Sequence, residues 1–213
     1  MTYDGICPVC RKHIHYIEEP RCMRCGKSLD QEEEEYCRDC GREPGYYEQG
    51  YSLWAHRGAV SKAVYDFKYK NKRRYGEVFA AEMAAHFAES LSGWGIQEII
   101  PIPLHRSRRR ARGYNQAELL AEGLGRILDI PVQKQALFRV KKTVPQKSLD
   151  NKGRTANMRG AFALSGQYQP KASVLLVDDI YTTGSTINGA AKMLRKAGAE
   201  KVYFLTISIG QGL

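Results

Sequence analysis

The sequence predicts an α/β fold with a mostly parallel sheet flanked by helices, preceded by a small cysteine-rich module. Two observations support this prediction. From residue 50 onward, continuous apolar strands alternate with amphipathic helices, which is typical of buried parallel strands joined by crossover helices. All six cysteines lie before residue 41. We therefore expect a metal-binding module over residues 1–49 and an α/β domain over residues 50–213.

The cysteines form three CxxC pairs, each separated from the next by 11 residues: Cys7/Cys10, Cys22/Cys25 and Cys37/Cys40. The chain begins without the basic-then-apolar order of a signal peptide, so this spacing favours zinc over disulfides. A CxxC turn presents two thiolates to one tetrahedral ion. Redox-active dithiols fit less well, because no pair lies between an apolar strand and a helix. A closed zinc site would be structural, since a segment of about 40 residues has too small a core to fold alone.

Six thiolates exceed what one ion needs, and the sequence leaves the ligand set open. The simplest ribbon uses the second and third pairs, Cys22/Cys25 and Cys37/Cys40. Cys7 and Cys10 would then need His13 or His15 to complete a second site. Alternatively, the first pair joins the second and the third is spare.

The elements of the α/β domain follow from their own patterns. Strands are expected at 50–56, 98–102, 174–177 and 202–207, and the last two are continuous apolar runs. Helices are expected where apolar residues recur every three or four positions. The helical stripes are Val60, Val64 and Phe67; Phe79, Met83, Phe87 and Leu91; Leu120, Leu124, Ile127 and Leu128; and Ile187, Ala191 and Leu194, which ends at Gly198.

The net charge of +10 is unevenly distributed. Residues 1–49 hold 7 Lys or Arg against 11 Asp or Glu, and the rest of the chain holds 26 against 12. Five arginines lie between Arg106 and Arg112. Such a cluster suits a phosphate-rich ligand, either a small polyphosphate or a nucleic acid, although a solvated basic face is the simpler alternative.

The segment VLLVDDIYTTGST, residues 174–186, combines a buried strand, two aspartates and a loop of small residues. Ligands of open parallel sheets bind beyond the carboxyl ends of the strands, where Asp178 and Asp179 are expected. Carboxylates there accept hydrogen bonds from vicinal hydroxyls or hold Mg²⁺ through water. The loop precedes a helix whose N-terminus favours an anion, and four hydroxyls add donors: Thr182, Thr183, Ser185 and Thr186. A sugar with a phosphate at one end fits both halves.

These residues resemble the phosphoribosyl pyrophosphate (PRPP) motif of type I phosphoribosyltransferases. The resemblance implies a type I phosphoribosyltransferase-like fold, with Asp178 and Asp179 on the ribose hydroxyls. The loop formed by Thr182, Thr183, Gly184, Ser185 and Thr186 would bind the 5'-phosphate. A Walker loop is absent, since GxxxxGK[ST] does not occur.

Further segments are similar to the ComF family, whose members pair a zinc module with such a domain. They are FKY at 67–69, IPIPLH at 100–105, RGYNQA at 112–117, the series Arg139, Thr143 and Gln146, then Arg154 and Asn157, and GAF at 160–162. By analogy, the IPIPLH turn is a pyrophosphate loop that presents Leu104, His105 and Arg106. The polar residues 139–160 would form a lid that closes over PRPP. Arg154 is the preferred lid cation, with Lys141, Lys142, Lys147 and Lys152 as alternatives.

Three functions stay open at this point. The first is a cytoplasmic phosphoribosyltransferase that uses PRPP with Mg²⁺, transfers the phosphoribosyl group to an unidentified acceptor and releases pyrophosphate, with Asp178, Asp179 and Arg154 as catalytic residues. The second, implied by the resemblance to ComF proteins, is a PRPP-responsive component of DNA uptake in natural competence that contacts single-stranded DNA and a helicase-like protein. The third is a regulator that binds another nucleotide. The sequence contains no run of about 20 apolar residues, so we expect no membrane insertion.

Overall fold

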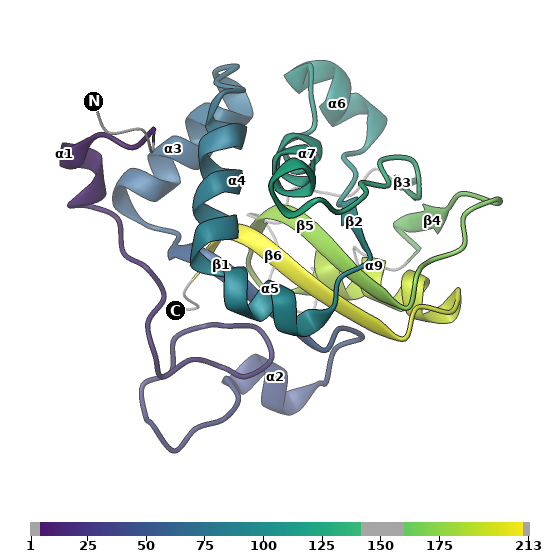
Figure 1. Ribbon diagram of the computed structural model, residues 1–213, viewed down its shortest axis with the longest axis horizontal. Coiled ribbons are helices and arrows are strands. Elements are labelled where there is room, and N and C mark those ends of the chain that lie inside the picture. The colour runs from purple at the N-terminus through teal and green to yellow at the C-terminus, as the bar shows by residue number, and fades with distance from the viewer. Residues whose placement is uncertain (1–4, 142–159, 211–213) are drawn as a thin grey trace.

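A four-stranded parallel sheet forms the centre of the computed structural model, which describes residues 5–141 and 160–210 (Figure 1). The strand order is β1-β6-β5-β2. The strands are β1 (Gln49–Ala55), β2 (Glu98–Pro101), β5 (Ser173–Tyr181) and β6 (Lys201–Ile209). The central strands β5 and β6 have apolar residues buried on both faces, which explains their unbroken apolar runs. The prediction of a mostly parallel sheet is confirmed.

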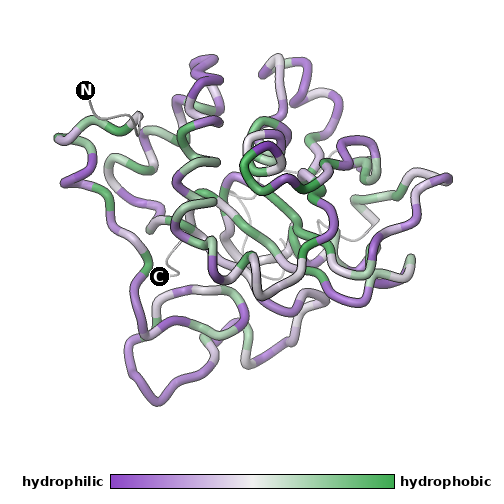
Figure 2. The backbone as a smooth tube through the Cα atoms, in the orientation of Figure 1, coloured by the Kyte–Doolittle hydropathy of each residue, from purple (hydrophilic) through white to green (hydrophobic). Residues whose placement is uncertain are grey.

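Helices cover both faces of the sheet. One face carries α3 (Gly58–Tyr69), α4 (Tyr75–His86), α5 (Ala88–Trp94) and α7 (Gln116–Leu128), which share an apolar cluster with the strands. The other face carries α9 (Ser185–Lys196) and the short antiparallel pair β3 (Leu137–Arg139) and β4 (Phe162–Leu164). Figure 2 shows that hydrophobic residues concentrate along the central strands between these layers.

The single helix expected through Phe79, Met83, Phe87 and Leu91 is two helices. Phe87 separates α4 from α5 and has φ −110° and ψ 18°. The hydrogen bonds nevertheless continue through the break: the Phe87 N–H donates to Met83 O at 3.1 Å, and the Leu91 N–H donates to Phe87 O at 2.9 Å. The helical spacing therefore persists, and all four side chains are buried as expected.

Helix α7 packs closely on α4 and differs from expectation at one position. A Cβ atom at Gly123 would lie only 2.5 Å from the Cβ of Ala80, so a glycine allows the two helices to approach. Leu120 and Leu124 are buried on this face, whereas Ile127, which was expected in the same stripe, is 53% exposed. An extra apolar residue on a helix surface is common in folded proteins.

The cysteine-rich module, residues 5–48 of the described chain, is tied to strand β1. It contains the short helices α1 (Pro8–Arg11) and α2 (Arg38–Arg42). Its backbone pairs with both ends of β1, because the Gly50 N–H donates to Arg24 O at 2.8 Å and the Ala55 N–H donates to His15 O at 3.0 Å. The module thereby covers the open edge of the sheet. The division at residues 1–49 and 50–213 stays a prediction.

The acidic strand β5 is longer than the apolar run suggested. It continues through Asp178 and Asp179 to Tyr181, and Asp178 lies in register with Thr206 of β6. Among the described helices, none is both long and apolar enough to cross a membrane.

Candidate functional site

The two loops that were expected to hold one ligand meet at the same edge of the sheet. Strands β5 and β2 are parallel neighbours, so their carboxyl ends coincide. The Ile102 N–H, in the IPIPLH turn after β2, donates to Val177 O at 2.9 Å. The turn therefore lies directly beside the start of the acidic pair Asp178 and Asp179, as the sequence predicted for a shared site.

Asp179 forms an ion pair with Lys68, the penultimate residue of α3. The Lys68 Nζ lies 2.8 Å from Asp179 Oδ1, and the two side chains are only 15% and 13% exposed. Partial burial strengthens this pair compared with a surface pair, since less water screens it. Lys68 belongs to the FKY segment, but sequence analysis assigned it no role.

Asp178 is in a different electrostatic environment. Burial and, to a smaller extent, the charge of Asp179 raise its pKa, the Asp179 N–H, Lys68 and Arg139 lower it, and the net pKa is about 7. Its Oδ1 accepts a hydrogen bond from the Asp179 N–H at 2.8 Å. The two adjacent carboxyl groups thus have different surroundings, because Asp179 has a cationic partner in Lys68 and burial raises the pKa of Asp178.

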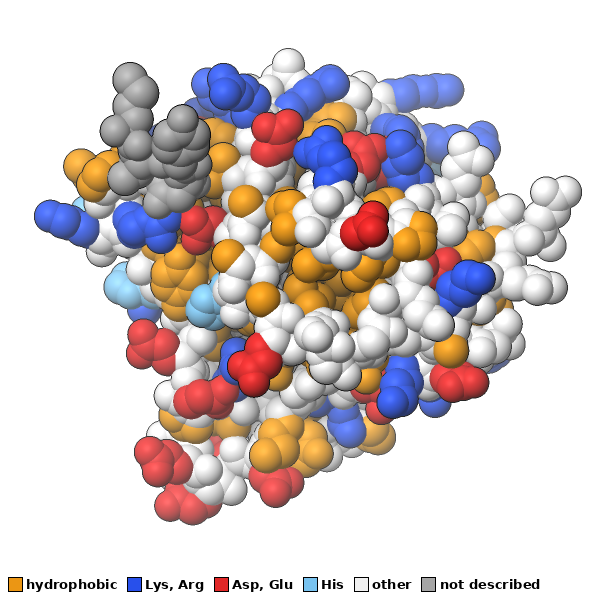
Figure 3. Space-filling model, in the orientation of Figure 1, with side chains coloured by type: hydrophobic (Ala, Val, Ile, Leu, Met, Phe, Trp, Pro, Cys, Tyr) orange, Lys and Arg blue, Asp and Glu red, His pale blue; other side chains and the backbone are white. Residues whose placement is uncertain are grey.

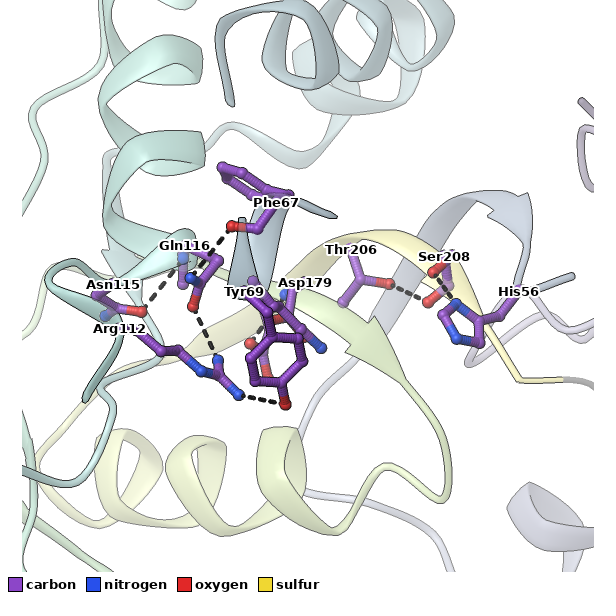
Figure 4. A network of polar contacts seen from close by, with 12 residues as sticks. His56, Phe67, Tyr69, Arg112, Asn115, Gln116, Asp179, Thr206 and Ser208 are labelled. Carbon is purple, nitrogen blue, oxygen red and sulfur yellow. Dashed lines mark hydrogen bonds and ion pairs between the residues drawn. The ribbon is translucent and has the colours of Figure 1, made fainter. Parts of the chain in front are cut away.

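The RGYNQA segment joins the elements around the site. Asn115 caps α7 by accepting from the Ala117 N–H at 3.2 Å, and its Nδ2 donates to Ile102 O at 3.0 Å. Tyr114 Oη and Gln116 Nε2 donate to Phe67 O, next to Lys68 (Figure 4). These buried side chains position the IPIPLH turn and the end of α3.

Arginines of α6 (Arg106–Arg112) and β3 interact electrostatically with the acidic pair, Arg108 with Asp179 and Arg139 with Asp178. Burial lowers the pKa of Arg108, as does the charge of Arg112, while Asp179 opposes both effects. Burial also lowers the pKa of Arg139, with a further contribution from Arg108, while Asp178 opposes them. These mutual effects show that the site gathers cations as well as carboxylates, which suits an anionic ligand with hydroxyl groups.

The side chain of Arg112 closes one side of this cluster. Its guanidinium lies 4.9 Å from the ring centroid of Tyr69 and donates to Tyr69 Oη at 3.1 Å. It also donates to Gln116 Oε1 at 2.9 Å. Figure 4 shows Tyr69, Arg112 and Gln116 converging near Asp179. Tyr69 is 58% exposed and Tyr114 is buried, so of these two tyrosines only Tyr69 can meet a partner at the surface.

The IPIPLH turn ends in a side-chain cap. His105 Nδ1 accepts from the Ser107 N–H at 3.3 Å, which begins α6 directly after the turn. Leu104 and His105 are partly exposed, and Arg106 is exposed. The predicted pyrophosphate loop therefore lies at the same end of the sheet as the acidic pair. Its ligand stays a prediction.

The TTGST loop joins β5 to α9. Gly184, its central residue, has φ +73° and precedes α9 as the N-cap. A Cβ atom at this position would lie 2.4 Å from Tyr181 Oη, so both the backbone angle and the close contact require glycine. Thr183 Oγ1 and Ser185 Oγ are 2.9 Å apart. The loop is thus a tight turn at a helix N-terminus, the arrangement expected for an anion.

Four cysteines form the metal-type cluster found in the described part of the chain: Cys22, Cys25, Cys37 and Cys40. Their sulfur atoms lie within 4.8 Å of one another and all four residues are buried. Cys25 Sγ and Cys37 Sγ are 3.6 Å apart, close to the separation of about 3.8 Å that a tetrahedral ion with 2.3 Å Zn–S bonds imposes. The thiols therefore fit a closed structural zinc site.

The first CxxC pair lies apart from this cluster. Cys7 and Cys10 are exposed at the ends of a short turn, where the Cys10 N–H donates to Cys7 Sγ at 3.3 Å. Their role as metal ligands, with or without His13 or His15, stays a prediction. The proposed lid cation Arg154 and its alternatives Lys142, Lys147 and Lys152 lie outside the described residues, and Lys141 is exposed.

Two residues near the site had no assigned role in the sequence analysis. Arg139, which the sequence offered only as part of a family-like series and of a polar segment, interacts electrostatically with Asp178 from β3. Tyr47, from the linker before β1, contacts Tyr181 through the two hydroxyl groups at 2.8 Å. Neither contact has a local sequence signal, because each joins residues far apart in the chain.

Family models match both parts of the chain. The model described as a double zinc ribbon domain matches residues 1–41, and the model described as a phosphoribosyl transferase domain matches residues 73–208. A solved structure of adenine phosphoribosyltransferase has a TM-score of 0.41 at 15% identity, covering 65% of this chain and 73% of that one.

Curated relatives are competence and DNA utilization proteins. Competence protein F of Haemophilus influenzae is 47% identical over 108 residues, which are 50% of this chain and 47% of that protein. Competence protein ComFC of Streptococcus pneumoniae is 31% identical, covering 72% of this chain and 71% of that protein. DNA utilization protein YhgH of Salmonella typhimurium is 27% identical, covering 95% and 89%. The chain thus aligns with about half the length of the Haemophilus protein.

Replacing one clustered cysteine should remove the metal. Cys22→Ser is expected to lose one zinc ion per chain and to destabilise the module, because three thiolates hold the ion less tightly and zinc supplies folding energy. Cys7→Ser should keep that ion. Elemental analysis of purified protein measures both. Zinc content unchanged in Cys22→Ser would contradict the four-cysteine assignment.

The raised pKa of Asp178 predicts a pH-dependent stability difference. An ordinary aspartate has a pKa of 3.8 and the folded protein raises it to about 7, so the unfolded chain loses its proton first and rising pH through this window favours unfolding. Asp178→Asn should therefore stabilise the protein more at pH 8 than at pH 4.5. The upper limit is about 4 kcal/mol at roughly 1.4 kcal/mol per pKa unit, and partial exposure reduces it.

Denaturant unfolding of wild type and Asp178→Asn at the two pH values measures this difference. The free-energy gap between the proteins should widen as the pH rises. A gap that stays constant, or narrows, would show that the Asp178 carboxyl titrates in its ordinary range.

Proposed function

The chain belongs to the ComF family of phosphoribosyltransferase-domain proteins, and on that premise we propose that it binds PRPP and transfers its phosphoribosyl group to a nitrogen acceptor, with release of pyrophosphate. The observation that supports this most is the meeting of three features at one sheet edge. They are the acidic pair on β5, the tight TTGST turn at the start of α9, and the IPIPLH turn beside the α6 arginines.

Each part of PRPP has a chemically matched partner in this proposal. Asp178 and Asp179 accept hydrogen bonds from the ribose hydroxyls. The loop of Thr182, Thr183, Gly184, Ser185 and Thr186 donates to the 5'-phosphate through backbone N–H groups and hydroxyls. Leu104, His105 and Arg106 face the pyrophosphate, and Arg108 and Arg139 supply further positive charge.

Magnesium fits the same site as a companion of PRPP. The two carboxyl groups are oxygen ligands of the kind Mg²⁺ prefers, directly or through water. When bound, the ion would neutralise charge on the pyrophosphate oxygens. Asp178 is the more available ligand of the two, because Asp179 already has Lys68 at 2.8 Å.

The proposed reaction is a displacement at the anomeric carbon of the ribose. The bond from that carbon to the pyrophosphate oxygen breaks, and the oxygen leaves with the electron pair. A bond to the acceptor nitrogen forms, and the nitrogen loses a proton to solvent. The protein's own part is to orient PRPP and stabilise the leaving group with cations, which is electrostatic catalysis. Arg154 is proposed as one of these cations when the segment 139–160 covers the ligand.

Removing both carboxylates should abolish PRPP binding while leaving the fold intact. Asp178→Asn with Asp179→Asn keeps the shape of both side chains but replaces one acceptor oxygen of each with a donor NH₂ group and removes the negative charge that attracts the ribose hydroxyls and Mg²⁺. Titration calorimetry with PRPP and Mg²⁺ measures the affinity. Asp129→Asn is the matched control, since Asp129 caps α7 with φ +55° and asparagine tolerates that conformation. Retained affinity in the double variant would remove the ribose assignment.

The same preparations test whether PRPP is a substrate. Pyrophosphate release from PRPP and Mg²⁺ is followed with and without a pool of purine, pyrimidine and pyridine bases, using Arg154→Ala as the comparison. Acceptor-dependent release that is lost in Arg154→Ala supports transfer. Binding without release, in folded zinc-loaded protein, would make PRPP a signal rather than a substrate.

A second function is favoured by the basic surface and by what the relatives are called. Exposed cations gather around the α3–α4 turn and α6, and Lys and Arg side chains line this side of the molecule in Figure 3. We define this basic face as Lys70, Lys72, Arg73, Arg74, Arg106, Arg109 and Arg110. The exposed rings of Tyr65 and Tyr69 lie 4.9 Å apart beside it. Phosphate-binding cations next to aromatic rings suit single-stranded DNA.

In this second function the protein acts in DNA uptake and responds to PRPP. The acidic zinc module is a poor surface for DNA, since thiolates add to its negative charge, and it is proposed instead as the contact for a helicase-like partner. A third possibility, a site for another nucleotide, would appear as competition by that nucleotide for PRPP.

Salt dependence tests DNA binding at the basic face. Arg106→Ala with Arg110→Ala should weaken binding of a single-stranded oligonucleotide and reduce the slope of log affinity against log salt by up to about 1.4, because each single-strand phosphate contact contributes about 0.7. Lys201→Ala is the control, because Lys201 begins β6 and so lies at the opposite end of the strands from the basic face. Equal slopes for all three proteins would exclude this face as the contact.

A further inference from the structure

The linker between the zinc ribbon and β1 contacts the strand end that precedes the TTGST loop. Tyr47 Oη and Tyr181 Oη are 2.8 Å apart, and the two residues are only 6% and 4% exposed. Tyr181 is the last residue of β5. A buried hydroxyl needs a partner, and here each tyrosine provides one for the other. The contact spans 134 positions in the sequence.

Packing leaves both rings little freedom. Phe204 of β6 lies against both tyrosines: the Tyr181 ring stacks on it with centroids 4.9 Å apart, and the Tyr47 ring meets it edge-on at 5.0 Å. Gly50 faces the same ring, and a Cβ atom there would lie 2.1 Å from it. The three aromatic rings therefore form one rigid cluster that joins the linker to the sheet.

The other end of this cluster touches the loop itself. Tyr181 Oη occupies the position next to Gly184, where even a Cβ atom would be 2.4 Å away. A second link runs in parallel: the Tyr46 N–H donates to Asn188 Oδ1 at 2.6 Å, and the Asn188 N–H donates to Gly184 O at 2.7 Å. The linker thus reaches the same glycine by two routes.

The zinc site adjoins this arrangement. Cys40, one of the four clustered cysteines, lines a cleft of about 900 Å³ together with Tyr47, Tyr181 and Gly184. Only six residues separate Cys40 from Tyr47. The position of the linker therefore depends on the end of the ribbon that the metal holds in place.

We propose that Tyr47 is a positioning residue for the TTGST loop. Its hydroxyl holds Tyr181 against Gly184, and the zinc ribbon thereby sets the shape of the loop that receives the phosphate at one end of the ligand. This inference rests on the proposed function, in which that ligand end is the 5'-phosphate of PRPP. The zinc module is then part of the binding site's support, and its role extends beyond covering the edge of the sheet.

The test compares PRPP with two smaller ligands, one that contains only its 5'-phosphate end and one that contains only its pyrophosphate end. Titrations of Tyr47→Phe use PRPP, ribose 5-phosphate and pyrophosphate, each with Mg²⁺. Affinity for PRPP and ribose 5-phosphate should fall about 3- to 10-fold, the effect of losing one hydrogen bond, while affinity for pyrophosphate stays at the wild-type value. Zinc content should remain near wild type, and the thermal unfolding midpoint should fall only by the effect of one lost hydrogen bond, since the ring is kept.

Two further variants make the result specific. Tyr181→Phe removes the same hydrogen bond from its other side, so it should give the same loss, and the double variant should lose no more than either single one. Tyr46→Phe is the matched control, because its backbone link to Asn188 and its ring beside Lys192 both remain.

The outcomes separate this inference from the function on which it rests. Wild-type affinity for ribose 5-phosphate in Tyr47→Phe, or an equal loss for pyrophosphate, would overturn the positioning role and leave Tyr47 with packing alone. Additive losses in the double variant would overturn it as well. If wild-type protein binds neither PRPP nor ribose 5-phosphate, the proposed function itself fails, and the inference fails with it.

Discussion

The parallel pairing of β5 with β2 on one side and β6 on the other determines where the candidate functional site of this protein lies. Because all three strands run in the same direction, the acidic pair, the IPIPLH turn and the end of β6 emerge at one edge. Burial of β5 on both faces prevents it from shifting in register, since a shift of one residue would place Asp178 in the apolar core. The position of the candidate site is thus a consequence of strand packing.

Three residues of the RGYNQA segment support the candidate site from within the core. Tyr114, Asn115 and Gln116 are buried and hydrogen-bond to backbone carbonyls of other elements. Their effect is to hold the end of α3, and with it Lys68, beside Asp179. A carboxylate with a fixed cationic partner and a neighbour that titrates near neutrality forms an asymmetric pair. Such asymmetry lets adjacent identical side chains take different roles.

The zinc module compensates for two weaknesses of a small α/β domain. It pairs with the open edge of β1, which would otherwise offer unpaired backbone groups to other chains. It also brings an aromatic linker against Phe204 and Tyr181, closing the core beneath the TTGST loop. A segment of this size cannot supply such rigidity from its own apolar contacts, so a metal that fixes four thiolates is a physically reasonable substitute.

The sequence by itself predicted the parallel α/β fold, a zinc module built from CxxC pairs, and the place of Asp178 and Asp179 directly after an apolar run, whereas the structure selected the second and third CxxC pairs and extended the strand through both aspartates. These features depend on local periodicity and spacing, which are visible in one chain. Only the tertiary structure decided that Lys68 pairs with Asp179, that Arg139 approaches Asp178, that the helix through Phe87 divides, and that Tyr47 meets Tyr181. Each of these depends on how separate elements pack, and packing distances have no signature in local sequence.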